Sequence, residues 1–485
     1  MERIARPRLE LLTEAEASRI VEEACRVLET IGVAVENEEG RRLLDEASAE
    51  RAGERHRIPE RLVREAISSA PRRFVIHDRD GNPAMRLGDD EVHFDPGSAA
   101  IQILDAGSWT RRDATSRDVV EMIRLVEGLP HYAAQATALT PGDIPVEIAD
   151  RYRLYLSLRH SRKPIVTGIF RSDGMAPMLE MLVAIRGGEK ALAERPLAIF
   201  DCCPSPPLKW SDLTCHSLIE CARAGLPAEL VSMPLAGATA PVTLREAVVQ
   251  HCAENLSGIV IHQLAGRGSP IVYGGAPAAF DMRRGTTPMG AIETMMLTAA
   301  YAEVGKRIGL PTHGYLALSD AKTPDYQAGM ESGIGALIAA LAGINVVSGP
   351  GMLDYLLTQS PEKLLLDHDA CGMALRLARG IDRRPLDPVE MIREVVQAGE
   401  ALSLESTRRF WKEELSVASS LIDRDGYGDW EAKGRISSAE RAREEVARRL
   451  SAAADPPLGG AGGSGIERIM LGEARRAGLS SLPAT

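Results

Sequence analysis

The sequence predicts an α/β fold, and within that class a (β/α)8 barrel, the TIM barrel. From about residue 115, short strand-like runs alternate with helical stretches of roughly 15 to 20 residues, the pattern of βα units on a parallel sheet. Polar and aromatic residues gather directly after these runs, as on the catalytic face of such a barrel. A doubly wound open sheet is the alternative, but it normally begins with a glycine-rich phosphate loop, and we find none.

Residues 1–114 are predicted to form an N-terminal region of helices and β-hairpins. Residues 14–31 place apolar side chains mostly on one helical face, and 59–69 form a second helix with Pro59 in its first turn. Between 73 and 112, turn signals such as Asp80-Gly81 indicate hairpins.

Residues 115–451 are predicted to be the barrel domain, completed by C-terminal helices. Seven strand-like runs are clear: 131–138, 164–170, 197–203, 229–234, 270–275, 310–316 and 344–349. An eighth is not evident after residue 350, so we expect it to be short or to come from an unexpected part of the chain. The glycine-rich stretch 452–465 is predicted to be a flexible linker. Residues 466–485 would then be a helical tail that either docks on a partner subunit or stays mobile.

Composition excludes several classes of protein. Of 485 residues, 45% are hydrophobic and 26% charged, as in an ordinary soluble globular protein, and the net charge of −11 argues against a nucleic-acid partner. No signal peptide or stretch of ~18 apolar residues is evident, so we expect a cytoplasmic, unanchored protein. Seven scattered cysteines suggest reduced thiols rather than a disulfide framework.

No metal or nucleophile motif is evident. Cys202, Cys203, Cys215 and His216 match no zinc spacing, and the two adjacent cysteines of a strand point to opposite faces. We therefore expect buried small side chains at these positions and no metal bound by this chain. A G-x-S-x-G nucleophile elbow and a Walker loop are also absent.

The stretch 311–331 holds the densest set of candidate site residues. It contains His313, Tyr315, Asp320, Asp325, Gln327 and Glu331. A solvated βα loop is the alternative, but such loops are usually short, roughly two to six residues.

Neighbouring strand ends add further candidates, namely Tyr273 with Gly274 and Gly275, Ser348 with Gly349, and Tyr355. Tyrosine faces near carboxylates suit a cationic ligand, since each ammonium–aromatic contact contributes ~0.5–2 kcal/mol. Alternatively, each tyrosine packs at the barrel rim with its hydroxyl in water.

The same stretches carry a family resemblance. The sequence is similar to the trimethylamine methyltransferase superfamily of corrinoid-dependent methyltransferases over roughly residues 10 to 450. The motifs that carry it are Phe94-Asp-Pro-Gly-Ser-Ala, Pro311-Thr-His-Gly-Tyr, Ser319-Asp-Ala-Lys, Asp325-Tyr-Gln-Ala-Gly, Ser348-Gly-Pro-Gly-Met-Leu-Asp and Leu421-Ile-Asp-Arg-Asp-Gly-Tyr.

The resemblance implies a TIM barrel whose open end accepts a separate corrinoid (cobalamin) protein. The founding trimethylamine enzymes carry pyrrolysine near the stretch that matches 313–327. This chain contains only the twenty common residues, so it resembles the branch without pyrrolysine. Some members of that branch demethylate quaternary amines such as glycine betaine.

Under this resemblance, Tyr273, Tyr315 and Tyr355 would surround the ammonium group. Asp320, Asp325 or Glu331 would supply countercharge or fix the loop, and His313 with Gln327 would bind a polar tail. We expect catalytic roles for His313, Tyr315, Asp320 and Glu331, substrate contacts from Tyr273, Asp325, Gln327, Ser348 and Tyr355, and cofactor contacts from Gly274, Gly275 and Gly349.

Three functions stay open at this point. The first is methyl transfer from a quaternary or tertiary amine to a corrinoid protein. The second is a ligand-binding or regulatory barrel without methyl transfer, and the third is a barrel methyltransferase with another acceptor such as a folate. A homo-oligomer is compatible with each of them.

Overall fold

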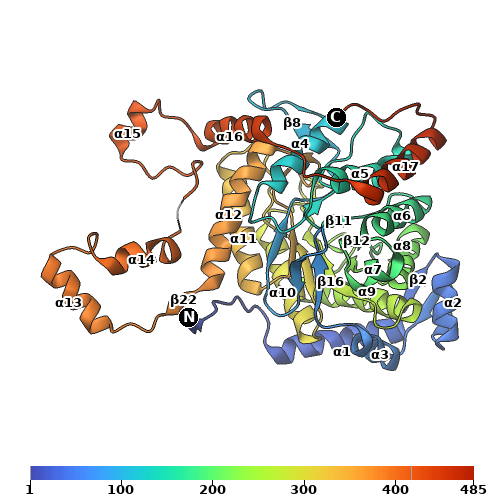
Figure 1. Cartoon of the computed structure of the whole chain (residues 1–485). Coiled ribbons are helices and arrows are strands. Elements are labelled where there is room, and N and C mark those ends of the chain that lie inside the picture. Colours follow the sequence, from blue (N-terminus) through green and yellow to red (C-terminus); the bar gives the residue numbers. More distant parts are fainter. Residues whose placement is uncertain (1, 417) are drawn as a thin grey trace.

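The computed structural model describes residues 2–416 and 418–485 and contains a parallel barrel of eight strands (Figure 1). In spatial order the strands are β10 (Gln135–Ala136), β11 (Ile165–Thr167), β12 (Ala198–Cys202), β14 (Ala228–Leu230), β16 (Ile271–Gly275), β18 (Thr312–Tyr315), β19 (Val346–Ser348) and β7 (His93–Asp95). A parallel bridge between Phe94 and Tyr132 joins the two ends of this sheet, and the Ala133 N–H donates to the Phe94 carbonyl at 2.8 Å. The predicted TIM barrel is confirmed.

Six of the seven strands predicted from the sequence lie within the expected runs, and the seventh, β14, begins one residue before its run of 229–234. The eighth is β7, which precedes the others in the chain and comes from the stretch predicted as hairpins. The expected boundary after residue 114 stays a prediction, although β7 on its N-terminal side belongs to the barrel.

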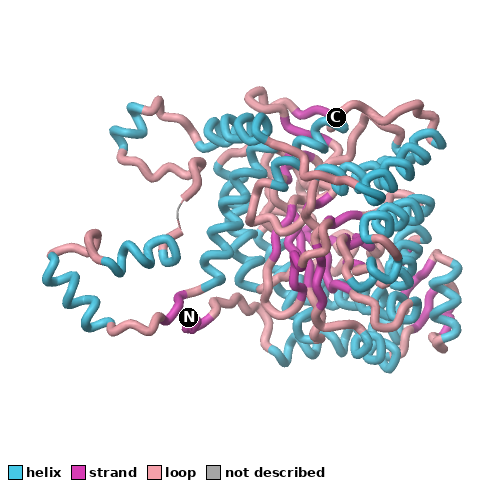
Figure 2. The backbone as a smooth tube through the Cα atoms, viewed as in Figure 1, coloured by secondary structure: helices cyan, strands magenta, loops and turns pink. Residues whose placement is uncertain are grey.

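Helices surround the sheet, and Figure 2 shows them as an outer layer around the magenta strands. They are α4 (Ser116–Glu127), α5 (Ala149–His160), α6 (Met175–Arg186), α7 (Glu189–Glu194), α8 (Asp212–Ala224), α9 (Leu244–Ala265), α10 (Ile292–Arg307), α11 (Tyr326–Ala342) and α12 (Pro361–Arg379). The N-terminal helices α1 (Glu14–Thr30) and α3 (Glu60–Ser69) pack over α9, which is why α9 is buried along most of its length.

Smaller sheets lie around the barrel. One contains β13 (Lys209–Trp210), β2 (Val33–Val35), β4 (Arg55–Arg57) and β3 (Glu50–Ala52), beside α2 (Glu38–Glu46). A second contains β20 (Met352–Leu353), β21 (Thr358–Gln359), β8 (Gln102–Leu104) and β9 (Arg111–Asp113), and a third pairs β15 (Leu235–Ala236) with β17 (Ala278–Ala279). The antiparallel pair β8–β9 is one of the predicted hairpins.

A second predicted hairpin closes the amino end of the barrel. Strands β5 (Phe74–His77) and β6 (Pro83–Leu87) are antiparallel, and their Ile76, Met85 and Leu87 are at most 1% exposed. These side chains form one apolar cluster with Ala134 and with residues of four barrel strands, Val166, Ile199, Val272 and Val346. Apolar side chains therefore fill the lower half of the barrel interior.

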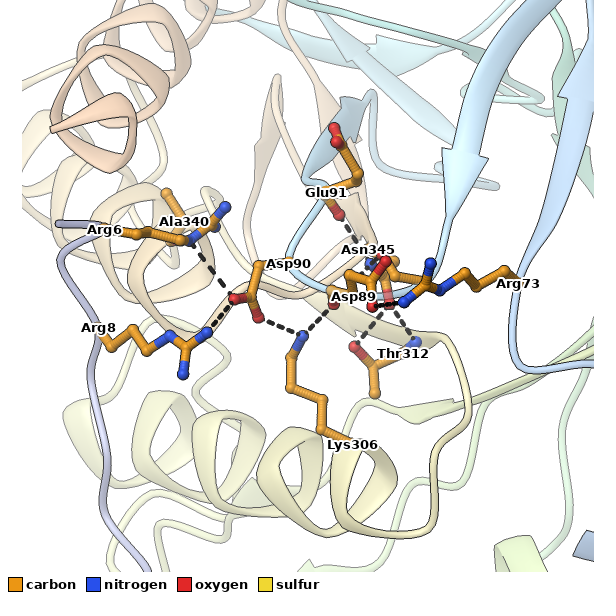
Figure 3. Close-up of polar contacts among 11 residues, drawn as sticks. Arg6, Arg8, Arg73, Asp89, Asp90, Glu91, Lys306, Thr312, Ala340 and Asn345 are labelled. Atoms are coloured by element: carbon orange, nitrogen blue, oxygen red, sulfur yellow. Dashed lines mark hydrogen bonds and ion pairs between the residues drawn. The ribbon is translucent and has the colours of Figure 1, made fainter. Parts of the chain in front are cut away.

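Polar contacts at the amino end hold β7 in the sheet (Figure 3). The Asn345 side chain, directly before β19, donates to the carbonyls of Gly88 at 3.0 Å and Glu91 at 2.8 Å, and accepts from the Thr312 N–H at 2.9 Å. Asp90 accepts from Arg8 at 2.7 Å and pairs with Lys306 at 3.0 Å. The segment before β7 is thereby tied to the starts of β18 and β19.

The C-terminal part leaves the barrel and returns to it. Strand β22 (Ile381–Arg383) pairs with β1 (Glu2–Ala5), and α13 (Pro388–Ala398), α14 (Glu405–Glu414) and α15 (Tyr427–Ala432) follow without a buried residue. Helix α16 (Ser438–Ala452) then packs against α12, and α17 (Gly460–Arg476) against α6 and α5.

The predicted linker 452–465 holds the end of α16, a short connection and the first turns of α17, which begins at Gly460 rather than at 466. The Asp455 carboxylate of the connection accepts two bonds from Arg124, at 2.8 and 2.9 Å. The tail thus docks on its own barrel. None of the described helices has a stretch both long and apolar enough to span a membrane.

Candidate active site

A layer of ionisable and polar side chains occupies the upper half of the barrel interior, above the apolar plug. Alternate residues of a strand share one face, so Asp201 lies on the same face as Ile199, and Ser348 on the same face as Val346. The layer contains Asp95, Asp201, Glu229, His313, Tyr315 and Ser348, from five different strands. It lies at the carboxyl ends of the strands, where TIM barrels carry their active sites.

Strand register places these side chains beside one another. Asp201 of β12 is the direct neighbour of Glu229 in β14. On the other side of the barrel, Tyr315 pairs with Ser348 and Ser348 with Asp95. Two acidic groups therefore lie together at one side, with a third across the interior.

His313 bridges the two sides. Its Nε2 lies 3.1 Å from Oε1 of Glu229, and both side chains are fully buried. The His313 and Tyr315 rings meet edge to face with centroids 5.0 Å apart. Gly274 on the neighbouring strand leaves the required space, because a Cβ there would lie 2.8 Å from the His313 Cβ.

Burial dominates the electrostatics of this layer. It raises the pKa of Glu229 and of Asp95 well above the usual carboxyl range, and Asp201 adds to the effect on both by repulsion. Burial also raises the pKa of Asp201 to about 6, opposed by a hydrogen bond from Glu229 and by the charge of Arg153. The pKa of His313 falls to about 3 because of burial. At neutral pH, Asp201 then carries a negative charge and His313 is neutral, whereas burial favours the uncharged forms of Glu229 and Asp95.

Arg153 supplies the cation of the site. It reaches from α5, donates to the Thr137 carbonyl at 2.8 Å, and places its guanidinium 4.3 Å from the centre of the Phe170 ring. Burial lowers its pKa to about 10, so it stays charged at neutral pH.

Several buried polar atoms in this layer lack a partner with hydrogen-bond geometry among the described residues. They include both carboxyl oxygens of Asp95, the Ser348 hydroxyl and Nδ1 of His313. Buried polar groups are normally paired, so this concentration at the upper end of a barrel indicates a place for a polar or charged ligand.

The acidic residues of the 311–331 stretch fix the loop at the barrel rim. Asp320 accepts the backbone N–H groups of Met289 and Gly290 at 2.9 and 2.8 Å, and burial raises its pKa to about 6. Glu331 accepts from the Asp320 N–H at 2.9 Å and from Gln327 at 2.9 Å. Of the two roles expected for these carboxylates, the contacts support fixing the loop.

Asp325 precedes α11 as its N-cap, and Gln327 lies in the first turn of this helix; both are exposed. The Asp325 carboxylate caps the helix by accepting the Ala328 N–H at 3.1 Å. Gln327 is engaged by Glu331, so neither side chain joins His313 in the barrel interior.

The three tyrosines expected to surround an ammonium group are not brought together. Tyr273 points outward to the helix layer, where its ring contacts His251 and Tyr301. The Tyr355 ring is covered by Lys322, whose Nζ lies 4.0 Å from the ring centre. Of the three, only Tyr315 lines the interior. Successive residues of a strand face opposite sides, so Tyr273 points outward while its neighbour Gly274 faces His313 in the interior.

The glycines expected to contact a cofactor have tight contacts within the chain. A Cβ at Gly275 would lie 2.4 Å from His251 Nε2, and one at Gly349 would lie 2.0 Å from the Leu316 carbonyl oxygen. These two glycines, like Gly274, allow close packing of the sheet, and their role toward a cofactor stays a prediction.

Sequence reasoning missed Asp95, Asp201, Glu229 and Arg153. The available signal was a single carboxylate inside an otherwise apolar strand, as in Ala198–Cys202, because charged residues are almost never buried without a reason. In the described part of the chain, no three His, Cys, Asp or Glu side chains form a group able to hold a metal ion. That this chain binds no metal stays a prediction.

This fold and this site define an enzyme of the TIM-barrel class. A monomethylamine methyltransferase from Methanosarcina barkeri (MtmB) has the same fold, with a TM-score of 0.53 over 91% of this chain and 88% of that one, at 11% identity.

Residues 2–469 match the family model of trimethylamine methyltransferase (MTTB). The chain is 33% identical to a trimethylamine methyltransferase MttB of Methanosarcina thermophila, covering 90% of this chain and 92% of that protein. It is 31% identical to an MttB of Desulfitobacterium hafniense (89% and 87%) and 28% identical to a glycine betaine methyltransferase of the same species (93% and 95%). The chain belongs to the trimethylamine methyltransferase family.

Proposed function

We propose that this protein transfers a methyl group from a quaternary amine of the betaine type to the Co(I) centre of a corrinoid carried by a separate protein. The observation that carries the proposal is the acidic layer with Tyr315 at the carboxyl ends of the barrel strands. Family membership and the relatives named above support the reaction class.

A quaternary ammonium group fits this layer. It has no N–H to donate, so it is recognised by negative charge and aromatic faces rather than by hydrogen bonds. Ionised Asp201 and the Tyr315 face offer both, and the cation would favour ionisation of Asp95 and Glu229 as well. The buried and unpaired oxygens of Asp95 would then face a positive charge.

Arg153 suits the other end of a betaine. Its guanidinium is buried and remains charged, and its charge lowers the pKa of Asp201. A carboxylate on the amine would pair with this group, a role expected earlier for His313 and Gln327.

The corrinoid, when bound with its partner protein, would supply a cobalt nucleophile that accepts the methyl group. The amine nitrogen can leave as a neutral amine, so no side chain has to deliver a proton to it. The residues of this chain then bind the cation, hold one methyl group toward the barrel mouth and exclude water.

Exposed apolar residues at the mouth suit contact with a corrinoid protein. Phe170, Met233 and Met282 follow β11, β14 and β17, and are 38%, 39% and 61% exposed. Because Co(I) persists only under reducing conditions, we further propose a cytoplasmic location, which the seven free cysteines also suit.

The experiment is a screen in which betaines and methylamines are incubated with the protein and Co(I) corrinoid. The demethylated product is measured by mass spectrometry, and the oxidation state of cobalt by its visible absorption spectrum. Amine-dependent loss of the Co(I) spectrum together with demethylated product supports the proposal. Binding of an amine by calorimetry without transfer to any corrinoid contradicts it and favours a ligand-binding barrel. Transfer to tetrahydrofolate alone favours the folate acceptor.

A further inference from the structure

The C-terminal helix α17 contacts the helix that carries Arg153 through a buried ion pair. Glu473 of α17 lies 3.1 Å from Arg151 of α5, and their side chains are 5% and 2% exposed. Figure 1 shows α17 beside α5 and α6. Apolar contacts already dock this helix, because Ile466 and Met470 are fully buried. A buried ion pair adds little stability compared with apolar packing, so this pair is better explained by what it orients.

Arg151 also holds the loop that follows β11. Its guanidinium donates to the Asp173 carbonyl at 2.9 Å. The preceding residue, Asp150, is 1% exposed, and its carboxylate accepts the Phe170 N–H at 2.9 Å. Gly174 fits closely against the same carboxylate, since a Cβ there would lie 2.4 Å from Asp150 Oδ2. Two adjacent side chains of α5 therefore hold the loop 170–174 at both ends.

Loop 170–174 in turn borders the candidate active site. The Arg153 guanidinium lies 4.3 Å from the centre of the Phe170 ring. Its hydrogen bonds to the Thr137 carbonyl and the Thr140 hydroxyl both start from Nη1, at 2.8 and 3.4 Å. Contacts from one nitrogen leave the plane of the guanidinium able to turn, and the nearby Phe170 ring restricts this rotation. The orientation of Arg153 thus depends on where the loop is held.

We propose that Glu473 is a positioning residue of the active site, which fixes the orientation of Arg153 through Arg151 and loop 170–174. For the binding of a substrate carboxylate, this inference rests on the function proposed above. Removal of one partner of a buried pair leaves the other charge uncompensated, so Arg151 would turn away and release the Asp173 carbonyl. Misplacement of a recognition group by about 1 Å is enough to weaken its action strongly, even when the change lies far from it. The tail helix thereby contributes to the selection of the substrate.

The first test measures hydrogen–deuterium exchange of the full-length protein without ligand. Glu473→Gln keeps the size of the side chain and removes its charge, so the amides of 168–175 should exchange at least tenfold faster than in the wild type. The amides of α17 around Met470 should keep their protection, because the apolar contacts remain. Glu467→Gln, at an exposed position of the same helix, is the matched control and should change neither segment.

The second test measures amine binding by calorimetry. Glu473→Gln should weaken binding of glycine betaine at least threefold and leave that of tetramethylammonium, which has no carboxylate, unchanged. In the Arg153→Met background, Glu473→Gln should have no further effect, because its influence on the ligand passes through Arg153. A residue that only supports the fold would not show this coupling.

The proposal is overturned by unchanged exchange of 168–175 in Glu473→Gln, or by loss of protection in α17, which would make Glu473 an anchor of the helix and nothing more. Equal losses for both ligands, or a further loss in the Arg153→Met background, would also overturn it. If the wild-type protein binds none of the amines, the proposed function fails, and the exchange measurement alone decides whether Glu473 holds the loop.

Discussion

Burial raises the pKa of Asp201 in the barrel interior to about 6, against a usual 3.8. A hydrogen bond from Glu229 and the charge of Arg153 oppose the effect of burial on this pKa, so Asp201 carries a negative charge at neutral pH. The same balance means that the site costs stability, because an ionised carboxylate is kept largely out of water.

We predict that Asp201→Asn stabilises the fold more at pH 8 than at pH 5. A raised pKa in the folded state gives stability that is present below about pH 3.8 and is lost as pH rises through about 6. The difference should be on the order of 1–3 kcal/mol in the free energy of unfolding. Denaturant titration at both pH values measures it, and a pH-independent difference would contradict the assignment.

Substitutions at Tyr315 test the proposed contact between its ring and the ammonium group of the ligand. Tyr315→Phe keeps the ring face and should change the affinity for a quaternary amine less than threefold. Tyr315→Ala should weaken it by about 0.5–2 kcal/mol. Calorimetric titration with glycine betaine measures both, and Tyr273→Phe serves as control because Tyr273 faces the helix layer. Equal affinity in Tyr315→Ala and wild type would exclude the contact.

A substitution at Arg153 tests whether the substrate is an amine that carries a carboxylate. Arg153→Met should weaken binding of glycine betaine at least tenfold, because the carboxylate loses its partner. Binding of tetramethylammonium should stay equal or tighten, because a like charge has been removed. Arg171→Met, at an exposed position, is the matched control. Equal losses for both ligands would show that Arg153 only supports the fold.

Elements differ in how clearly the sequence reveals them. The seven predicted strands lie in largely apolar runs, as buried parallel strands usually do. Strand β7 escapes that pattern because its inward residues, His93 and Asp95, are polar and only Phe94 is apolar. Asp95 was missed for the same reason. Asp201 and Glu229 lie in strands that were predicted, but a single carboxylate within an apolar run was not recognised as part of a site.

Helix α17 was obscured by composition. Its first turns are rich in glycine, which predicts a linker. In the structure these glycines allow close packing on α6, where a Cβ at Gly465 would lie 3.0 Å from that of Ala184. Tertiary packing overrides the low helix propensity of this segment.

Asn345 holds β7 at the amino end of the barrel. Asn345→Ala would leave the buried Thr312 N–H and the carbonyls of Gly88 and Glu91 without this partner. We expect a loss of about 2–4 kcal/mol in the free energy of unfolding. Asn82→Ala, in the exposed turn of the β5–β6 hairpin, should cost far less. Similar denaturation midpoints for the two variants would contradict this role.

The whole molecule is a barrel held at two distant places by its C-terminal part. Helix α16 packs on α12, and α17 packs on α6 with Ile466 and Met470 fully buried. Glu473 and Arg151 form an ion pair of 3.1 Å between α17 and α5, and both side chains are buried.

Met470→Ala should loosen α17 without unfolding the barrel. The cavity left by the shortened side chain weakens the packing of α17 on the barrel by about 2–5 kcal/mol, enough to release a single docked helix. Limited proteolysis should cut the connection 453–459 at least tenfold faster, while the main thermal midpoint moves little. Met282→Ala, at an exposed position, is the control. Unchanged cleavage would mean that α17 is held by other contacts.

The apolar hairpin closes the amino end of the barrel, so a ligand would enter the interior from the carboxyl ends of the strands. If the methyl acceptor covers the carboxyl end of the barrel, the amine has to bind first, and the demethylated product leaves only after the acceptor has dissociated. Turnover would then follow a compulsory order of addition. A large excess of acceptor protein over enzyme would slow the reaction at low amine concentration, and raising the amine would relieve the inhibition.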